Sequence, residues 1–170
     1  MDHADLVQQV ESLHPQCFGW AMACCERRRE EAEDVLHDAY VKVLDGTARY
    51  DGRSTLKTWL FGVIRRTASA RRRRDRLRSM LGLRGAVRID GPVAAPSPAD
   101  DAMSADRRAR TLQAMSCLSA RQREVLRLVF YHDVTIEEAA TIMNVSIGSA
   151  RVHYQRGKTR MAALLSEDRP

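Results

Sequence analysis

The chain has 170 residues, enough for one ordinary domain or two small ones. Its hydrophobic fraction of 44% is that of a globular protein and excludes wholesale disorder. No stretch approaches the roughly 18 uninterrupted apolar residues of a membrane span, so we expect no membrane insertion. The opening segment MDHADLVQQVESLH is acidic and amphipathic, unlike a signal peptide, and we therefore expect a cytoplasmic protein.

The positive charge is concentrated in one segment. The net charge is +6 and the pI is near 9.5. Between Arg65 and Arg78 the segment RRTASARRRRDRLR holds eight arginines and one aspartate. Such a run is either a solvated surface or a nucleic-acid contact, and it indicates nucleic acid only if other features agree.

Apolar residues three and four apart predict three helices in the first part of the chain. The three sets are Leu6, Val10, Leu13, Cys17 and Ala21; Ala32, Val35, Leu36, Ala39, Tyr40 and Val43; and Leu56, Trp59, Leu60, Val63 and Ile64. The loop DGTARYDGRS, with two Asp-Gly steps, precedes the last helix, for which Ser54 is the expected N-cap. These elements predict a three-helix first domain over residues 1–78.

Residues 79–105 have a different character. The segment GPVAAPSPADDAMSAD concentrates proline, glycine and small residues and shows no sustained period. We interpret it as a flexible linker, acidic in its later half.

Helical periodicity returns in residues 106–170, the second predicted domain. Ser119 and Gln122 have the spacing of a capping box, as do Thr135 and Glu138. No alternating strand pattern occurs anywhere. The fold class is therefore predicted as all-α, with two small helical domains joined by a flexible linker.

The segment TIEEAATIMNVSIGSARVHYQRGKTRM predicts a helix-turn-helix. The first helix spans about 136–143, Asn144 or Val145 turns the chain, and Ser146 caps a second helix. On that helix the residues expected to pack inward are Ala150, Tyr154, Met161, Leu164 and Leu165. The opposite side carries Ser149, Val152, Gln155, Arg156 and Thr159, with Arg151 and Lys158 at its margins.

This polar side suits the major groove of DNA, where Arg and Gln read base edges while Lys and the helix N-terminus meet phosphates. An ordinary solvated face of a helical hairpin is the alternative. The arginine run favours DNA, because neutralised phosphates supply most sequence-independent affinity.

Two segments resemble extracytoplasmic-function sigma factors of bacterial RNA polymerase. EEAEDVLHDAYVKVLDGTARYDGRSTLKTWLFGVIRRTASARRRR resembles their region 2, and LSARQREVLRLVFYHDVTIEEAATIMNVSIGSARVHYQRGKTRMAALL resembles their region 4. The second segment alone would also suit a response-regulator output domain. The order of the two segments and the linker between them are typical of the sigma family.

The resemblance implies three sets of binding residues. Those that would dock on the clamp helices of the polymerase's largest subunit are Asp34, Val35, Leu36, Asp38, Tyr40 and Lys42. Those near the −10 DNA are Thr47, Arg49, Tyr50, Asp51, Arg53, Ser54, Lys57, Trp59, Arg65 and Arg66. Those at the −35 DNA are Ser146, Ser149, Arg151, Val152, Gln155, Arg156 and Lys158.

In the family, the loop matching Thr47–Ser54 captures a base flipped from the non-template strand, whose exposed edges and faces a protein pocket can bind. Trp59 is either a core residue that shapes this loop from behind or part of the base pocket. Arg66 stands where the family usually has asparagine, and Val152 where it often has serine. A −35 sequence therefore cannot be transferred from relatives.

The four cysteines, Cys17, Cys24, Cys25 and Cys117, fit no zinc spacing and are interpreted as reduced thiols acting as small hydrophobes. The alternative is redox or metal sensing, since His14 and Cys17 are three residues apart and could share a helical face. We expect no metal and no cofactor.

The sequence thus predicts a promoter-specificity subunit without chemistry of its own, bound to core RNA polymerase (clamp helices and flap) and to promoter DNA. The resemblance also implies an anti-sigma partner and a stress or envelope response, with the acidic linker in the polymerase's nucleic-acid channels. The rival interpretation is a stand-alone helix-turn-helix regulator that binds duplex DNA without polymerase. An enzyme is disfavoured, because no phosphate-binding glycine loop and no HExxH motif occurs.

Overall fold

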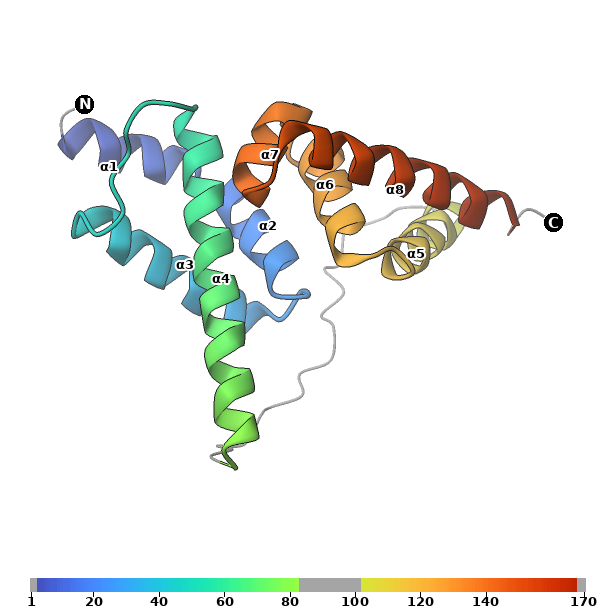
Figure 1. The fold of residues 1–170 in the computed structure, drawn as a ribbon, viewed down its shortest axis with the longest axis horizontal. Helices are drawn as coiled ribbons and strands as arrows, with labels where there is room; N and C mark the ends of the chain where they lie inside the picture. Colours follow the sequence, from blue (N-terminus) through green and yellow to red (C-terminus); the bar gives the residue numbers. More distant parts are fainter. Residues whose placement is uncertain (1–2, 83–101, 168–170) are drawn as a thin grey trace. The chain divides into compact units, whose positions relative to one another are not determined.

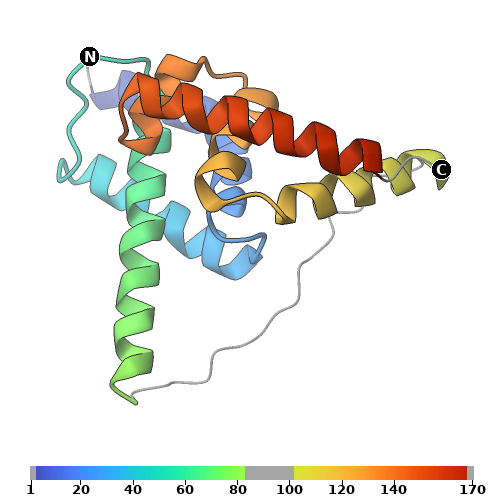
Figure 2. The same cartoon turned by 45° about the vertical axis from the view of Figure 1, so that its right-hand side comes forward.

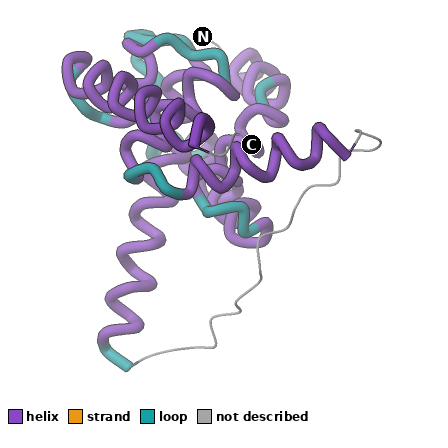
Figure 3. The backbone as a smooth tube through the Cα atoms, turned by 90° about the vertical axis from the view of Figure 1, so that its right-hand side faces the viewer, coloured by secondary structure: helices purple, strands orange, loops and turns teal. Residues whose placement is uncertain are grey.

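The computed structural model describes residues 3–82 and 102–167 of the chain. They form two compact units, Met1–Val93 and Ala94–Pro170, each considered by itself below. Within the described ranges every regular element is a helix and none is a strand (Figure 3). This confirms the all-α prediction.

The first unit contains four helices: α1 (His3–Ser12), α2 (His14–Cys24), α3 (Arg29–Leu44) and α4 (Leu56–Met80) (Figure 1). The sequence predicted three, because the first apolar series continues across the break at Leu13. Pro15 lies in the first turn of α2. Its ring fixes φ and removes a backbone donor, so a single helix through this point would lose a hydrogen bond and meet a steric clash. The chain instead starts a new helix with proline at its beginning.

The core of the first unit lies where α2, α3 and α4 pack together. Trp20 is 1% exposed, and its indole Nε1 donates a hydrogen bond of 3.0 Å to the carbonyl oxygen of Phe61 on α4. The two rings also stack, with their centroids 5.7 Å apart. Burial of the ring without this bond would leave a polar N–H unsatisfied, so the hydrogen bond and the stacking together fix how α2 meets α4.

The start of α4 differs by one residue from the prediction. Thr55, not Ser54, is the N-cap, and its side-chain oxygen accepts a 3.2 Å hydrogen bond from the backbone N–H of Thr58. The hydroxyl of Ser54 instead donates a 3.3 Å hydrogen bond to the carbonyl oxygen of Thr55, and the Ser54 carbonyl accepts a hydrogen bond from the hydroxyl of Tyr50. Both residue types cap well, so local preference could not choose between them.

The arginine run forms the second half of α4. Buried residues on this helix stop at Ala68, and the residues beyond it extend past α2 and α3 (Figures 1 and 2). The linker predicted over 79–105 lies mainly outside the described residues. Within them, α4 continues to Met80 and the next helix starts at Ala102. The proposed domain limits remain predictions.

The second unit contains α5 (Ala102–Ser116), α6 (Ala120–Tyr131), α7 (Ile136–Met143) and α8 (Ile147–Glu167). Both predicted capping boxes are present, at the starts of α6 and α7. Asn144 adopts the left-handed conformation (φ 53°, ψ 54°) that ends α7. The Oγ of Ser146 then accepts a 3.1 Å hydrogen bond from the N–H of Ser149 at the start of α8. The helix-turn-helix is thus confirmed.

Glycine at position 157 lets α8 approach α6 closely. Gly157 is buried, and a Cβ there would lie 3.1 Å from Cδ1 of Leu126. Ala150 is fully buried on the same side of α8, as predicted. Leu165 was predicted to pack inward, but it is 39% exposed, because it lies at the end of α8 beside an open groove.

Candidate functional site

Six of the residues predicted to contact −35 DNA lie on α8, with Lys158 at the margin, and the seventh, Ser146, directly precedes this helix. All seven are exposed: Ser146, Ser149, Arg151, Val152, Gln155, Arg156 and Lys158. Val152 is 45% exposed, which leaves its methyl groups able to touch a thymine methyl. The face opposite the α6 contact is therefore free for a groove of DNA to approach.

Arg151 is already engaged with a neighbouring helix. Its Nη2 lies 2.8 Å from Oε1 of Glu137 in the first turn of α7. The hydrogen bond from Arg151 is the main cause that lowers the pKa of the Glu137 carboxyl. Sequence reasoning missed Glu137, because the two residues are fourteen positions apart and lie on different helices, so no helical period relates them. Their proximity is set by the angle between α7 and α8.

The loop before α4 exposes four of the ten residues predicted to contact the −10 strand. These four are Thr47, Arg49, Asp51 and Arg53. The loop is ordered by short-range hydrogen bonds, of which one runs 2.8 Å from the backbone N–H of Thr47 to Oδ1 of Asp45. This bond and the side-chain bond from Thr47 hold the pKa of the Asp45 carboxyl below its usual value.

Trp59 supports this loop. Its ring lies 5.4 Å from that of Tyr50, at an interplanar angle of 57°, and both side chains are half-buried. The Tyr50 hydroxyl donates a 2.5 Å hydrogen bond to the carbonyl oxygen of Ser54. Trp59 therefore holds one end of the loop through Tyr50 and still shows part of its own surface.

Two of the residues predicted to dock on polymerase belong to the core instead. Val35 is 0% and Leu36 4% exposed, so both side chains pack in the core of this unit, and a role for them in polymerase binding stays a prediction. A helix in contact with both α2 and α4 has a wider buried stripe than one resting on a single neighbour. The side of α3 that remains exposed carries Asp34, His37, Val41 and Leu44.

The polar residues of the same predicted set make contacts within the unit. Arg71 of α4 lies 2.5 Å from Oδ2 of Asp34 and 3.7 Å from Oδ2 of Asp38. Lys42 donates a 3.0 Å hydrogen bond to Oγ1 of Thr67. These contacts join α3 to α4, so the carboxylates have a structural role as well as a place on the outer surface.

Comparison with known families accounts for this arrangement. Residues 9–78 match the family described as Sigma-70 region 2, and residues 108–161 match Sigma-70, region 4. Together the matches cover more than two thirds of the chain. The chain belongs to the sigma-70 family.

Individual relatives of this sigma factor include members of the extracytoplasmic-function group. SigK of Mycobacterium sp. (strain KMS), an ECF RNA polymerase sigma factor, is 27% identical over 128 residues, which are 74% of this chain and 65% of SigK. The chain thus spans about two thirds of the length of SigK. The RNA polymerase sigma factor YlaC of Bacillus subtilis (strain 168) is 25% identical, with 99% of this chain and 97% of YlaC aligned.

A solved structure has the same fold. The sigma factor RpoE of Bartonella quintana, solved in complex with the anti-sigma factor NepR, matches with a TM-score of 0.73 at 26% identity. The match covers 97% of this chain and 99% of RpoE. Both helical units of the sigma factor therefore have counterparts in one known protein.

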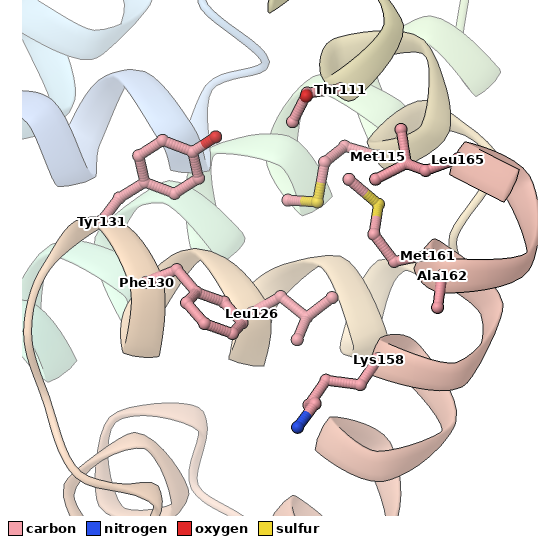
Figure 4. Close-up of a pocket in the computed structure, with 9 residues that line it drawn as sticks. All are labelled: Thr111, Met115, Leu126, Phe130, Tyr131, Lys158, Met161, Ala162 and Leu165. Atoms are coloured by element: carbon pink, nitrogen blue, oxygen red, sulfur yellow. The ribbon is translucent and has the colours of Figure 1, made fainter. Parts of the chain in front are cut away.

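The region 4 unit of the sigma factor also has an apolar groove, which sequence reasoning did not anticipate. It encloses about 370 Å³ between α5, α6 and α8 (Figure 4). Its lining residues are Thr111, Met115, Leu126, Phe130, Tyr131, Lys158, Met161, Ala162 and Leu165. Phe130 and Tyr131 are 59% and 63% exposed, so large aromatic surface stands open at its edge.

The thiols of the sigma factor differ in exposure. Cys17 and Cys25 are fully buried, and burial raises their pKa to about 11 and about 12, respectively. Cys24 is half-buried and Cys117 is exposed. The hydroxyl of Tyr40 connects His14 and Cys17. It lies 3.1 Å from Nδ1 of His14 and forms a hydrogen bond with Cys17.

No metal-binding group of three or more His, Cys, Asp or Glu side chains occurs among residues that the structure describes. None of the helices in these ranges has the length and apolarity needed to cross a membrane.

Proposed function

We propose that this sigma factor recruits core RNA polymerase to particular promoters and carries out no chemistry itself. Residues 1–78 would bind the clamp helices and the −10 DNA, and residues 106–170 the −35 DNA, with 79–105 as the tether. The supporting observation is that all seven predicted −35 residues are exposed, Ser146 at the start of the recognition helix and the other six on it. The family match of both units supports the division of labour.

The polymerase contact in region 2 is assigned to the exposed side of α3. Val41 and Leu44 are 45% and 48% exposed and lie about two and three turns beyond the carboxylate of Asp34. An apolar pair beside an acidic group gives a docking surface both burial and orientation. Val35 and Leu36 would support this surface from the core instead of touching the clamp.

The polymerase flap would occupy the apolar groove of region 4. The open aromatic surface of Phe130 and Tyr131 suits an apolar segment of a partner. Lys158 lines the same groove, with its ammonium 5.6 Å from the centre of the Tyr154 ring. α8 carries the recognition face and also lines one side of the groove. This one helix could therefore contact polymerase and DNA at the same time.

At the −10 element, the loop from Thr47 to Ser54 would hold an unstacked base. Protein surfaces must replace the stacking energy that the base loses, a few kcal/mol. The partly exposed rings of Tyr50 and Trp59 at the end of this loop provide such a surface. Lys57 and Arg66 on α4 would contact the flanking phosphates.

The two DNA contacts need not be strong individually. Once one unit is bound to polymerase, binding of the other becomes intramolecular, which can add about 10²–10⁴ in avidity. This dependence on polymerase separates the proposal from a stand-alone regulator. The latter would protect duplex DNA by itself in a footprint.

The deciding experiment adds the purified chain to core RNA polymerase that lacks other sigma factors and maps transcription starts over a genomic library. We expect a defined set of new start sites that share −35 and −10 sequences. Unaltered start sites, or no complex between the chain and the core enzyme, would contradict the proposal. A footprint of the chain alone is the control for the regulator.

We further propose that the protein works in the cytoplasm in a stress or envelope response and is held inactive by an anti-sigma protein. The structural likeness to RpoE, solved with the anti-sigma factor NepR, supports such a partner. Co-purification of the chain from cells grown without stress should identify it. Polymerase alone in these fractions would contradict this part.

A further inference from the structure

A thiol, an imidazole and a phenol meet between α2 and α3. His14 and Cys17 lie three residues apart on α2, a spacing that places both side chains on one face of the helix. Tyr40 of α3 reaches between them. Its hydroxyl lies 3.1 Å from Nδ1 of His14 and forms a hydrogen bond with Cys17. An imidazole nitrogen and a thiol sulfur are therefore directed at one point, which the Tyr40 oxygen holds.

The three side chains form a path from solvent to the core. His14 is exposed, Tyr40 is half-buried and Cys17 is 0% exposed. The imidazole is held over this path by neighbouring rings, because its centroid lies 6.5 Å from that of Phe18 and 6.0 Å from that of Tyr40. A small ion that first meets His14 at the surface would have only the Tyr40 hydroxyl between it and the sulfur.

The two donors select the class of ion. A thiolate sulfur and an imidazole nitrogen suit soft or borderline ions such as Cu(I) and Zn²⁺. A closed zinc site needs four ligands. In the ranges that the structure describes, no three or more His, Cys, Asp or Glu side chains gather where one ion could bind them all. Cu(I) has a filled d shell and is satisfied by two ligands in a linear arrangement, so it is the ion that this pair fits.

We propose that Cys17 and His14 bind a Cu(I) ion between α2 and α3, in the place of the Tyr40 hydroxyl. The thiolate sulfur and the imidazole Nδ1 each form one bond to the ion. The S–H bond breaks and its proton leaves to solvent, and the copper stays in its +1 state throughout. Tyr40 loses both hydrogen bonds and turns away, because a neutral phenol is a hard donor and a poor ligand for Cu(I).

The surroundings of Cys17 favour the bound ion over a free thiolate. Burial raises the pKa of this thiol to about 11, so the metal-free site keeps its proton near neutral pH. A coordinating thiol is deprotonated outright, which removes that barrier. The positive charge of Lys57 acts in the same direction, since it lowers the pKa of Cys17. Thiolate and Cu(I) together carry no net charge, and a neutral pair is tolerated in a buried position far better than a lone anion.

Cys25 provides a comparison within the same unit. It lies at the C-cap of α2, is also 0% exposed, and has its pKa raised by burial to about 12. The charged groups that affect its pKa are Glu31 and three arginines, in place of the His14 and Tyr40 pair around Cys17. Burial alone is thus common to both thiols, whereas the adjacent imidazole distinguishes Cys17.

The test titrates the full chain with Cu(I) under anaerobic conditions, against the competing chelator bicinchoninate. All proteins carry Cys24→Ala and Cys117→Ala, which removes the two thiols that are not fully buried. We expect one Cu(I) per chain and, near pH 8, release of one proton per ion. Copper X-ray absorption should show one sulfur and one nitrogen ligand.

Two single substitutions in this background identify the ligands. His14→Ala should weaken Cu(I) binding by more than about 100-fold, the upper range for loss of a group that only orients a ligand. His14 is exposed, so this change should leave the thermal unfolding of the metal-free chain unaltered. Cys17→Ser should abolish binding and proton release, whereas the matched control Cys25→Ala should retain both.

Tyr40→Phe tests the displacement of the hydroxyl. Without the hydroxyl the ion no longer has to break two hydrogen bonds, so this variant should bind Cu(I) more tightly than its parent. Weaker binding by Tyr40→Phe would make the phenol a ligand and overturn the proposed arrangement.

Other results would overturn the site itself. These are Cu(I) binding that survives His14→Ala or Cys17→Ser, equal losses in Cys17→Ser and Cys25→Ala, or tighter binding of Zn²⁺ than of Cu(I). The assay contains neither polymerase nor DNA, so its outcome is independent of the proposed function.

Discussion

The carboxylate of Glu137 on α7 lies 2.8 Å from the guanidinium of Arg151 on α8. Both side chains are more than half exposed, at 52% and 62%, so the pair contributes little to folding stability. Its consequence is local. Nη2 of the Arg151 guanidinium is bound to Glu137 on the neighbouring helix α7. This contact restricts the directions from which the guanidinium would approach DNA.

Substitution of either partner should change promoter selection. Arg151→Ala should weaken transcription from promoters that depend on the −35 element by about 1–3 kcal/mol if the guanidinium contacts a base. Glu137→Gln should reduce discrimination between −35 sequences and raise general DNA affinity, because a negative charge near the phosphates is removed. Competition transcription with mutated −35 elements measures both effects.

The double substitution shows whether Glu137 acts through Arg151. In an Arg151→Ala background, Glu137→Gln should have little further effect on sequence discrimination. An undiminished effect in that background would mean that Glu137 works independently. Arg156→Ala is the comparison variant. Arg156 is exposed on the same face of α8, whereas the ion pair of Glu137 is with Arg151.

Gly157 should tolerate no added methyl group without cost. A Cβ there would lie 3.1 Å from Cδ1 of Leu126 and 3.3 Å from Cβ of Gln122. Gly157→Ala should therefore destabilise the region 4 unit by about 1–3 kcal/mol, as overpacking usually does. Thermal unfolding followed by circular dichroism measures the change.

Gly148→Ala is the matched control on the same helix. The nearest atom to a Cβ there is the Oγ of Ser146 at 4.0 Å. Alanine has a helix propensity about 1 kcal/mol better than that of glycine, so this variant should be as stable as the parent chain or slightly more stable. Equal destabilisation by both alanine variants would contradict the close α6–α8 approach.

The two tryptophans should respond differently to substitution. Trp20→Phe removes the hydrogen bond to the Phe61 carbonyl and leaves a void in the core, so we expect a loss of about 1–3 kcal/mol. Trp59→Phe affects a half-buried ring and should cost less stability, but it should impair opening at −10. Urea unfolding and permanganate footprinting measure the two properties. A larger stability loss for Trp59→Phe would contradict the assigned packing.

The buried thiols should be slow to react and sensitive to alkaline pH. With pKa values of about 11 and about 12, Cys17 and Cys25 have little thiolate at pH near 8, so iodoacetamide should label exposed Cys117 first. Peptide mass spectrometry of timed samples tests this order. Labelling of Cys17 as fast as Cys117 would contradict its burial.

The same thiols predict the direction of a pH effect on stability. The ordinary pKa of the unfolded thiols is 9.0, and folding raises it to about 11 for Cys17. Above pH 9 the unfolded chain releases protons that the folded chain keeps, so the free energy of unfolding should fall as the pH rises toward these folded values. Urea unfolding at intervals from pH 8 to pH 11 measures this decline, and Cys17→Ala should reduce it.

Features that depend on a few neighbouring residues could be predicted from the sequence. Capping boxes at Ser119 and Thr135, the turn at Asn144 and the exposed side of α8 were all predicted correctly, because each follows from local hydrogen bonding or helical period. The effect of Pro15 could also have been foreseen, but the apolar series across Leu13 outweighed it. The choice of Thr55 over Ser54 could not, since both are good N-caps.

The amino-acid sequence by itself determined that the chain is helical, basic along one helix and divided into two units of the sigma-70 type. Tertiary packing alone decided which members of each predicted set face a partner: it buried Val35 and Leu36, joined Arg71 to Asp34, and brought Glu137 to Arg151. Helical period gives the angle of a side chain around its own axis. The fraction of a helix surface that is buried depends on the number and crossing angles of the neighbouring helices. The apolar pattern of one helix does not specify these.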